Sequence, residues 1–457
     1  MEHRVSALAI ATILLGSSLA GAQDEARPNI VVVLVDDLRW NGTGVTGHPF
    51  VETPSIDRLA REGVVFRNAF VTTPLCSPSR ASFLTGRYAR SHGVIRNGLH
   101  ELELTTFPLL LEDSGYQTAF VGKWHMGTDD TPREGFTRWV GFSGQGNYRE
   151  QELNIDGHAV TRPGHLTDVL NQYALEFVRD AATSGQPFML YLSHKAVHEP
   201  FTPPPRHFEL YADEPVPCTP GCDDTLVGKP ALTRFVPDTT PPEPRRTGLP
   251  VENIREQMSL LVSVDSGLGD LERALTDTGV LDRTIVVFTS DNGYFHREHA
   301  LADKRWPYEE SIRIPFIVRY PPLAEAGTRN DALVLNIDLA PTLLELAGIP
   351  IPSAVDGKSL VPLLAGAGGS SRTSFVTEYF DEASFPRVPS WESIRTESLK
   401  FIRYPRLGRD FDELYDLMSD PYELENQISN TEYSPQLETL ERQLDRLLES
   451  IPDNSGR

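Results

Sequence analysis

The amino-acid sequence predicts an α/β fold built around a large, mainly parallel sheet, and two observations support this. The first is that Asn29–Val35 and Thr284–Phe288 are continuous apolar runs rich in β-branched residues, which is typical of strands buried on both faces. The second is that helical patterns separate such runs, because strands that alternate with helices favour a parallel sheet sandwiched by helices. Ligands of such sheets bind beyond the carboxyl ends of the strands.

The other elements of the main domain follow from patterns of the same kind. Further strands are expected at Gln117–Val121, Pro187–Leu192 and Pro315–Arg319. Helices are expected at Ser55–Glu62, Ser79–Tyr88, Leu166–Ala182, Glu256–Thr278 and Asp338–Ala347. The proline-rich stretch 200–250 is a long irregular excursion to which the sequence assigns no role.

A small α+β subdomain is expected at the C-terminal end. Residues 365–373 (AGAGGSSRT) have the composition of a linker. Beyond them, short strands are expected at Ser374–Tyr379, Leu399–Tyr404 and Leu414–Leu417, followed by an amphipathic helix over Pro435–Ser450. We therefore expect a main domain over 23–366 and a C-terminal subdomain over 373–457.

Composition excludes several classes of protein. The chain has 457 residues with 21 Phe, 14 Tyr and 5 Trp, which is far too aromatic for a disordered protein. Its formal net charge is −22, from 42 Lys plus Arg against 64 Asp plus Glu, and this argues against nucleic acid as a partner. Taken as a global number, the charge also disfavours an anionic substrate, unless cations gather locally in one pocket.

The N-terminal segment 1–22 is expected to be a secretory signal peptide. Arg4 precedes the apolar run Ala7–Leu15, and Ala20–Ala22 has the small-residue pattern of a cleavage site. The alternative is an uncleaved anchor. No later segment approaches the length of a membrane helix, so we expect a periplasmic or secreted protein without a membrane span.

The three cysteines do not all pair. Cys218 and Cys222 flank Thr-Pro-Gly, a turn sequence, so they could close a small disulfide loop, which suits an exported protein. Cys76 is then left over, and an odd cysteine in an exported chain asks for an explanation.

Two acidic pairs follow the two strongest strands. Asp36 and Asp37 come directly after the first, and Asp291 and Asn292 follow the second. Three carboxylates and an amide supply hard oxygen ligands, which suit Ca²⁺ or Mg²⁺ rather than Zn²⁺. The alternative is that these residues simply end strands and open turns.

The leftover cysteine begins a specific motif. Cys76–Arg80 reads C-S-P-S-R and is followed by L-T-G-R at Leu84–Arg87, which resembles the signature of type I sulfatases in the alkaline phosphatase superfamily. In that family a formylglycine-generating enzyme converts the cysteine to formylglycine, an aldehyde. The alternative is a buried structural thiol at the start of a helix.

The resemblance extends over nearly the whole chain and implies an alkaline phosphatase-like fold. Family-like blocks lie at Gly122–Gly127, Ser193–Pro200, Ser290–Gly293, Asp303–Pro315 and Glu413–Leu417. The second and fourth blocks look most like those of N-acetylglucosamine-6-sulfatases and related polysaccharide sulfatases.

The block Glu413–Leu417 resembles the family's C-terminal subdomain, whereas the other blocks, by resemblance, contribute to one catalytic set. Asp36, Asp37, Asp291, Asn292 and residue 76 would bind Ca²⁺, with Mg²⁺ less favoured. Arg80 would anchor the hydrated aldehyde, and Lys123, His198 and Lys304 would hold the sulfate oxygens. His125 would act as the base, while His198, with Lys304, would protonate the leaving oxygen.

The implied reaction is hydrolysis of a sulfate ester on a carbohydrate. One hydroxyl of the hydrated aldehyde attacks sulfur and expels the alcohol, and loss of the proton from the second hydroxyl then releases sulfate and restores the aldehyde. The first rival function is a phosphonate or phosphate ester hydrolase of the same superfamily. The second is a non-catalytic glycan-binding relative, against which the intact catalytic set argues.

Substrate contacts are expected from residues beside the blocks. The histidines are His194, His296 and His299, with Glu298 between the last two. The aromatic residues that could stack on sugar rings are Trp40, Trp124, Phe295, Trp306 and Tyr308. The alternative for both groups is local packing.

Overall fold

The computed structural model describes residues 27–98, 100–234, 236, 248–367 and 372–456. The expected signal peptide, 1–22, lies outside the described residues, as do residues 368–371 of the expected linker. Among the helices that are described, none is both long enough and apolar enough to cross a membrane.

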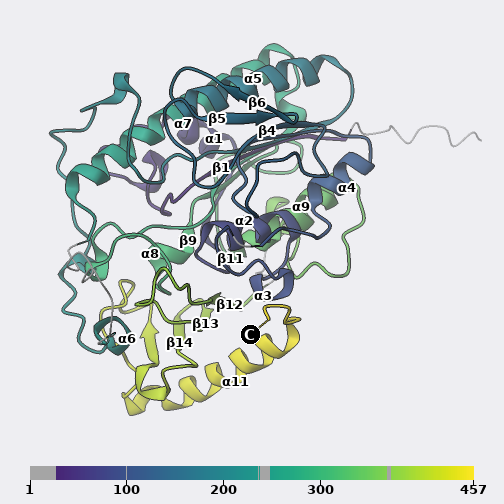
Figure 1. The fold of residues 1–457 in the computed structure, drawn as a ribbon. Helices are drawn as coiled ribbons and strands as arrows, with labels where there is room; N and C mark the ends of the chain where they lie inside the picture. Colours follow the sequence, from purple (N-terminus) through teal and green to yellow (C-terminus); the bar gives the residue numbers. More distant parts are fainter. Residues whose placement is uncertain (1–26, 99, 235, 237–247, 368–371, 457) are drawn as a thin grey trace, which may run out of the picture.

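The main domain is organised by one mixed sheet, as the sequence predicts (Figure 1). Within the described residues its eleven strands follow the order β11-β2-β10-β8-β1-β7-β3-β4-β5-β6, with β9 paired to β2. The five central strands β8, β1, β7, β3 and β4 are parallel to one another. The strands are β1 (Asn29–Val35), β2 (Val64–Phe70), β3 (Gln117–Lys123), β4 (Arg138–Phe142), β5 (Glu152–Ile155), β6 (His158–Thr161), β7 (Phe188–Ser193), β8 (Thr284–Ser290), β9 (Arg313–Ile314), β10 (Phe316–Arg319) and β11 (Thr328–Leu335).

Helices cover both faces of this sheet. The α-helices are α1 (Pro54–Glu62), α2 (Cys76–Thr85), α3 (Ala89–His92), α4 (Phe107–Asp113), α5 (Leu166–Thr183), α6 (Pro230–Thr233), α7 (Val251–Asp277), α8 (Glu309–Ile312), α9 (Leu339–Leu346), α10 (Val361–Leu364) and α11 (Ser434–Ser450). Short 3₁₀ turns lie at Gly44–Thr46, Pro205–His207, Pro220–Asp223, Leu281–Arg283, Glu298–Ala300, Asn336–Asp338, Arg409–Phe411 and Thr431–Tyr433.

Strand β1 shows how the layers form. Its residues Val31, Val33 and Val35 share an apolar core with α1, α5 and α7. The alternate residues of the strand face the other way, into a second core that includes α2, α4 and α9. Because both faces of the strand are buried, its sequence is continuously apolar, which is the pattern that identifies it in the sequence.

The C-terminal subdomain is an antiparallel sheet covered by one helix, seen at the bottom of Figure 1 with α11 in yellow. Its strands are β12 (Ser374–Tyr379), β13 (Trp391–Thr396), β14 (Leu399–Arg403) and β15 (Glu413–Asp416). Leu437, Leu440, Leu444 and Leu448 of α11 are buried at helical spacing. One apolar cluster joins this subdomain to Phe70 and Leu75 of the main domain, so the two parts share a core.

Several elements differ from the sequence prediction. Helix α2 begins at Cys76 rather than Ser79, because Leu75 is still extended and the helix starts directly after it. Strands β2, β4, β5, β6, β9, β11 and β13 were not predicted. Polar Arg67 and Asn68 interrupt the apolar pattern of β2, and β5 and β6 are four-residue strands at the edge of the sheet.

Candidate active site

The ends of β1 and β8 bring the two predicted acidic pairs together. The strands are parallel neighbours with Val35 opposite Ser290, so the residues that follow each strand meet at the same edge of the sheet. Oxygen atoms of Asp36, Asp37 and Asp291 lie within 4.8 Å of one another, and all three side chains are buried. Asp37 adopts a left-handed backbone with φ 65°, a conformation that is uncommon outside glycine. We call these three residues the acidic cluster.

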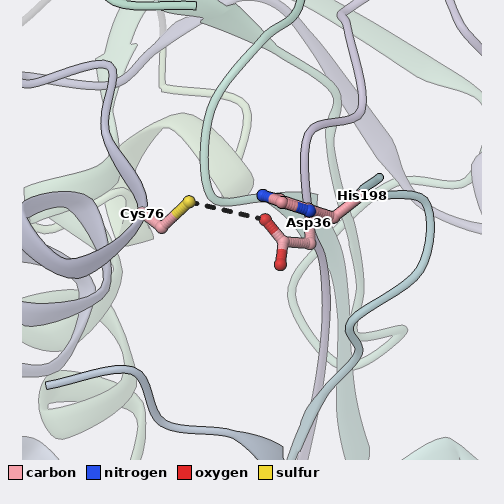
Figure 2. Close-up of side chains that lie close together, drawn as sticks. All are labelled: Asp36, Cys76 and His198. Atoms are coloured by element: carbon pink, nitrogen blue, oxygen red, sulfur yellow. Dashed lines mark hydrogen bonds between the residues drawn. The ribbon is translucent and has the colours of Figure 1, made fainter. Parts of the chain in front are cut away.

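Cys76 lies at the acidic cluster. It is the first residue of α2 and is fully buried, and its Sγ is 3.7 Å from Oδ1 of Asp36. Figure 2 shows that the thiol, the Asp36 carboxylate and the His198 imidazole lie close together. Burial raises the pKa of the Cys76 thiol to about 12, although Lys123 and Lys304 oppose this.

Arg80 ties α2 to the same cluster one helical turn after Cys76. Its Nε and Nη2 donate to Oδ2 of Asp291 at 3.0 and 2.7 Å, and Nη2 is 3.4 Å from Asp36. Its Nη1 donates to the backbone carbonyl of Lys123 and to Oγ of Ser193. This buried fork therefore fixes α2 against the ends of β3, β7 and β8.

Two lysines bind the remaining carboxylates. Nζ of Lys123, at the end of β3, donates to Asp36 and, at 2.6 Å, to Oε1 of Gln145. Nζ of Lys304 is 2.6 Å from both oxygens of Asp37. Each carboxylate of the acidic cluster thus has one cation of its own.

Glycine is needed at position 122, next to Lys123, because a Cβ there would lie 1.8 Å from the carbonyl oxygen of Ser193.

The Asp291 carboxyl nevertheless holds its proton more tightly than that of Asp36. Burial, and then repulsion from Asp36, raise the pKa of Asp291 to about 7 despite Arg80. Burial acts in the same direction on Asp36, but the surrounding cations hold its pKa well below the ordinary value. Asp36 is therefore the ionised member of this pair, and Asp291 is the member that holds a proton in the free site.

The residues of the cluster fit a divalent cation. Asn292 donates through Nδ2 to Oδ1 of Asp37 at 2.6 Å, whereas its buried Oδ1 has no hydrogen-bond partner among the described residues. An orphaned amide oxygen beside three carboxylates is the hard ligand set that Ca²⁺ and Mg²⁺ prefer. Asp36, Cys76 and His198 form a second possible ligand group that shares Asp36 with the first.

His198 is held with one ring nitrogen toward the cluster. Its Nδ1 is 2.7 Å from the carbonyl oxygen of Glu199, so this nitrogen carries the proton, and Nε2 is 3.6 Å from Oδ2 of Asp37. Burial and the cation of Lys123 lower the pKa of His198 to about 4.

Two residues that the sequence did not single out support His198. Nζ of Lys195 donates to the same Glu199 carbonyl at 2.8 Å and lies 4.9 Å from the centre of the Tyr148 ring. The Tyr148 hydroxyl donates to the backbone carbonyl of His198 at 2.7 Å. Lys195 could have been found from the sequence, because it belongs to the family-like block at 193–200. Nothing in the sequence marks Tyr148.

His125 lies on the Lys123 side of the site. It is buried with a left-handed φ of 62°, and its carbonyl accepts a hydrogen bond from Oγ of Ser77 in α2. Its Nδ1 has no partner among the described residues. Burial and the cations of Lys123 and Arg80 lower its pKa well below the ordinary value, which keeps the ring neutral.

The C-terminal subdomain fixes the segment that carries Lys304. Nε1 of Trp391 donates to the carbonyl of Arg305 at 2.7 Å, and Arg305 pairs with Glu382 at 2.9 Å. Further along the segment, Lys400 pairs with Glu309 at 2.8 Å.

The structure does not bring every predicted substrate residue to the acidic cluster. His299 is fully buried and bonds Asp224 at 2.6 Å; burial acts against its charge, but Asp224 and Glu310 raise its pKa to about 9. His194 is also fully buried, and neither ring nitrogen has a partner among the described residues. His296 bonds Gln257 at 2.7 Å, and Gln257 in turn donates to the carbonyl of Asp37.

Most of the predicted stacking residues are part of the core. Trp124 is 4% exposed and packs against Phe120, Phe136 and Trp139, while Trp306 is 5% exposed in the core shared with the subdomain. Phe295 and Tyr308 are fully buried. For these four the alternative of core packing agrees with the structure, because an inaccessible ring cannot stack on a sugar. Trp40 is half-buried.

Within the excursion, a disulfide joins Cys218 to Cys222 and closes the small loop that the sequence suggested. Cys76 is the free cysteine of the described chain.

Comparisons with known proteins agree with this geometry. The family model described as Sulfatase matches residues 28–349, and one described as N-sulphoglucosamine sulphohydrolase, C-terminal, matches residues 297–450. N-acetylglucosamine-6-O-sulfatase of Bacteroides thetaiotaomicron is 30% identical over 98% of this chain and 91% of its own length. N-acetylglucosamine-6-sulfatase of Homo sapiens is 32% identical over 84% of this chain and 74% of its own.

Solved structures give the same result. A protein in complex with its substrate D-glucosamine-2-N,6-O-disulfate superposes with a TM-score of 0.84 and 29% identity, over 94% of this chain and 99% of that one. The phosphonate monoester hydrolase of Agrobacterium radiobacter superposes with a TM-score of 0.73 at 22% identity, over 93% of this chain and 96% of its own, which shows a shared fold.

The raised pKa of Asp291 predicts that binding of a divalent cation at the acidic cluster, tested with Ca²⁺, strengthens with pH. A proton and the metal compete for this carboxylate, so affinity at pH 5.5 should be about 30-fold weaker than at pH 8. The measurement is the increase in Tm on adding CaCl₂ to metal-free protein at each pH. Asp291→Asn, which has no titrating group, should bind weakly at both.

The raised pKa of Asp291 also makes the stability of the metal-free protein depend on pH. Because the folded state keeps the Asp291 proton that the unfolded chain releases, this group's stabilisation is lost as the pH rises from about 4 through 7.

A Ca²⁺-induced rise in Tm that is equal at both pH values would contradict the assignment of Asp291 to the metal site.

Proposed function

The chain belongs to the sulfatase family, which makes it a sulfuric ester hydrolase, and from that premise we propose that its substrate is a sulfate ester on a carbohydrate. The observation that carries the proposal is the position of Cys76, buried against Asp36 and flanked by the cations Arg80, Lys123 and Lys304. A sulfated glucosamine is the first substrate to test, because two relatives are named N-acetylglucosamine-6-sulfatases or 6-O-sulfatases.

We propose that residue 76 acts as formylglycine, whose hydrate attacks sulfur, carries the sulfate covalently and releases it through its second hydroxyl. The support is the C-S-P-S-R motif at the start of α2, with its cysteine unpaired. A divalent cation held by Asp36, Asp37, Asp291 and Asn292, most simply Ca²⁺, would supply a lower pKa for the attacking hydroxyl.

The other residues of the site have roles that follow from their positions. Lys123 and Lys304 flank the cluster from β3 and from the segment before α8, where their ammonium groups can hold sulfate oxygens as charge develops. Arg80 holds α2, and with it residue 76, against the strand ends. Together they place three cations around one anionic group.

The two histidines are suited to proton transfer. His125 is neutral and has an uncommitted ring nitrogen, so it can accept the proton of the attacking residue. His198 presents Nε2 to the cluster and can return a proton to the leaving oxygen. A bound sulfate ester, being anionic, opposes the shift that keeps this ring neutral in the free site.

The rival functions have less support. Relatives that act on phosphonates share the fold at under 25% identity, which says nothing of the substrate. A non-catalytic relative does not need the ordered set of Cys76, Lys123, His125, His198 and Lys304. Export to the periplasm or outside the cell remains our proposal from the N-terminal sequence.

Residue 76 provides the first test of the chemistry. Protein made together with a formylglycine-generating enzyme should show a residue lighter than cysteine at position 76 by peptide mass spectrometry, and should react with hydrazides. It should release sulfate from glucosamine 6-sulfate faster than it cleaves a phosphonate ester, and Cys76→Ala should abolish turnover. Active protein with an unmodified thiol at position 76 would overturn the mechanism. Dominant cleavage of the phosphonate ester would overturn the function.

The leaving group provides a second test, of His198 and its support. His198→Ala should slow hydrolysis of a sugar sulfate about 100-fold or more, but affect 4-nitrophenyl sulfate far less, because nitrophenolate leaves without a proton. Lys195→Met should also slow hydrolysis of the sugar sulfate more than that of 4-nitrophenyl sulfate, but with a smaller loss. The reason is that Lys195 does not donate the proton itself and only positions the His198 ring, through the shared Glu199 carbonyl. Lys358→Met, at an exposed position, is the matched control.

The comparison of the two substrates separates proton donation from simple damage to the fold. Equal losses on both substrates in Lys195→Met would show that Lys195 stabilises the structure without positioning the proton donor.

A further inference from the structure

A cavity of about 280 Å³ lies among residues that follow β1 and β8 in the chain. Three segments and Ile254 of α7 line it: the loop after β1 from Arg39 to Phe50, the disulfide segment from Val216 to Cys222, and residues 296–298 after β8. The first and third of these follow the same strands that carry the two acidic pairs. We call it the Arg297 cavity, after the half-buried arginine in its wall.

The wall of the Arg297 cavity is linked to the acidic cluster through one side chain. Gln257 of α7 donates through Nε2 to the carbonyl of Asp37 at 3.3 Å, and its Oε1 bonds Nε2 of His296 at 2.7 Å. His296 lines the cavity, and so does Arg39, two residues after Asp37. No residue of the acidic cluster lines the cavity itself; His296 and Gln257 form the hydrogen-bonded link from its wall to Asp37.

The charge of the cavity is positive although the protein is strongly acidic. Arg39 is committed, because Nη2 pairs with Glu298 at 2.9 Å and Nε donates to Asn41 at 2.6 Å. The Arg297 guanidinium, in contrast, makes no hydrogen bond or ion pair with any residue that the structure describes; the hydrogen bonds of this residue are those of its backbone, to Glu298 and Ala300. A planar, uncommitted guanidinium suits two oxygens of a carboxylate or a sulfate.

The rest of the lining suits a sugar ring. Trp40 is half-buried, and the Arg313 guanidinium lies 4.3 Å from the centre of its ring, which restrains the indole. Nδ1 of His48 accepts from the N–H of Val51 at 3.2 Å, so the ring proton is on Nε2 and can be donated. An aromatic surface with a few polar donors is typical of carbohydrate and other small-ligand sites.

The excursion closes one side of the cavity. The disulfide Cys218–Cys222 makes its segment compact, and Oγ1 of Thr219 is hydrogen-bonded to Oε1 of Glu298 at 3.3 Å. The segment also lies close to Glu298, because a Cβ on Gly221 would be 3.1 Å from the Cβ of Glu298. This wall is therefore built against the loop that carries Arg297.

We propose that the Arg297 cavity binds a part of the substrate that carries a second anionic group, a sulfate or a carboxylate, with Arg297 as its partner. The proposal rests on the function proposed above and narrows the substrate to a saccharide with at least two anionic groups. The second group comes from the same ring as the cleaved ester or from the adjoining unit.

The test compares kcat/KM on substrates that differ in the second charge. Glucosamine 6-sulfate has one anionic group, glucosamine 2-N,6-O-disulfate has two on one ring, and a 6-sulfated disaccharide with a uronate has its second on the adjoining unit. We expect wild-type protein to prefer a dianionic substrate, and Arg297→Gln to lose about tenfold of that preference, through KM. Arg179→Gln, at an exposed position of α5, should keep it.

The substrate on which the loss is larger identifies the source of the second anion. A loss that is equal on the one-charge and two-charge substrates, or no loss at all, would overturn the proposal. If Arg297→Gln does not fold, Arg297→Lys replaces it, because it keeps the charge without the fork and should lose a smaller part of the preference.

A binding measurement separates this proposal from the proposed function. Should the wild-type protein cleave none of these compounds, the function fails, and calorimetric titration with glucosamine 2-N-sulfate and with glucosamine still tests the cavity. About tenfold weaker binding of the first compound alone in Arg297→Gln would support the cavity, whereas unchanged Kd values would overturn it.

Discussion

Three carboxylates buried at the ends of two neighbouring strands are the constraint on which the rest of the site depends. Buried carboxylates remain ionised only when cations or hydrogen-bond donors surround them. Here Asp36, Asp37 and Asp291 take one cation each, and those cations come from β3, from α2 and from the segment before α8. Because the partners come from distant parts of the chain, the cluster also fixes how those parts meet. The buried Oδ1 of Asn292, which has no hydrogen-bond partner among the described residues, adds the free oxygen ligand that favours a metal there.

The C-terminal subdomain contributes to the site through its packing. Its strands hold the segment that carries Lys304, by way of Trp391 on Arg305 and Lys400 on Glu309. It also shares one apolar core with the main domain. A sheet with no residue in the acidic cluster thus determines where one of the three cations lies, which gives a physical reason for its presence in a sulfatase.

The net charge of −22 and an anionic substrate are compatible because charge is organised locally. The fold places Arg80, Lys123 and Lys304 against the acidic cluster, and the uncommitted guanidinium of Arg297 in the cavity formed by residues after β1 and β8. An acidic exterior disfavours non-specific binding of polyanions, whereas the local field attracts a particular anionic group. The excursion, which has no evident role in the sequence, forms a wall of the cavity next to this field.

The sequence alone determined the fold class, the family and the residues of the acidic cluster, because those depend on patterns that are local in the chain. The continuous apolar strand Asn29–Val35 and the motif at Cys76–Arg80 can be recognised without knowing what they touch. The short edge strands, and strand β2 with its polar residues, were not predicted from the sequence. Their stability comes from neighbouring strands rather than from their own composition.

Only the tertiary structure decided which of the flanking residues could meet a ligand. Trp124 and Trp306 resemble sugar-binding residues in the sequence but are core residues in the fold, and His299 is tied to Asp224. In contrast, Lys195, Tyr148 and Arg297 acquire their importance from partners, or from the lack of one among the described residues. Burial and pairing depend on segments far apart in the sequence, and for that reason no local pattern records them.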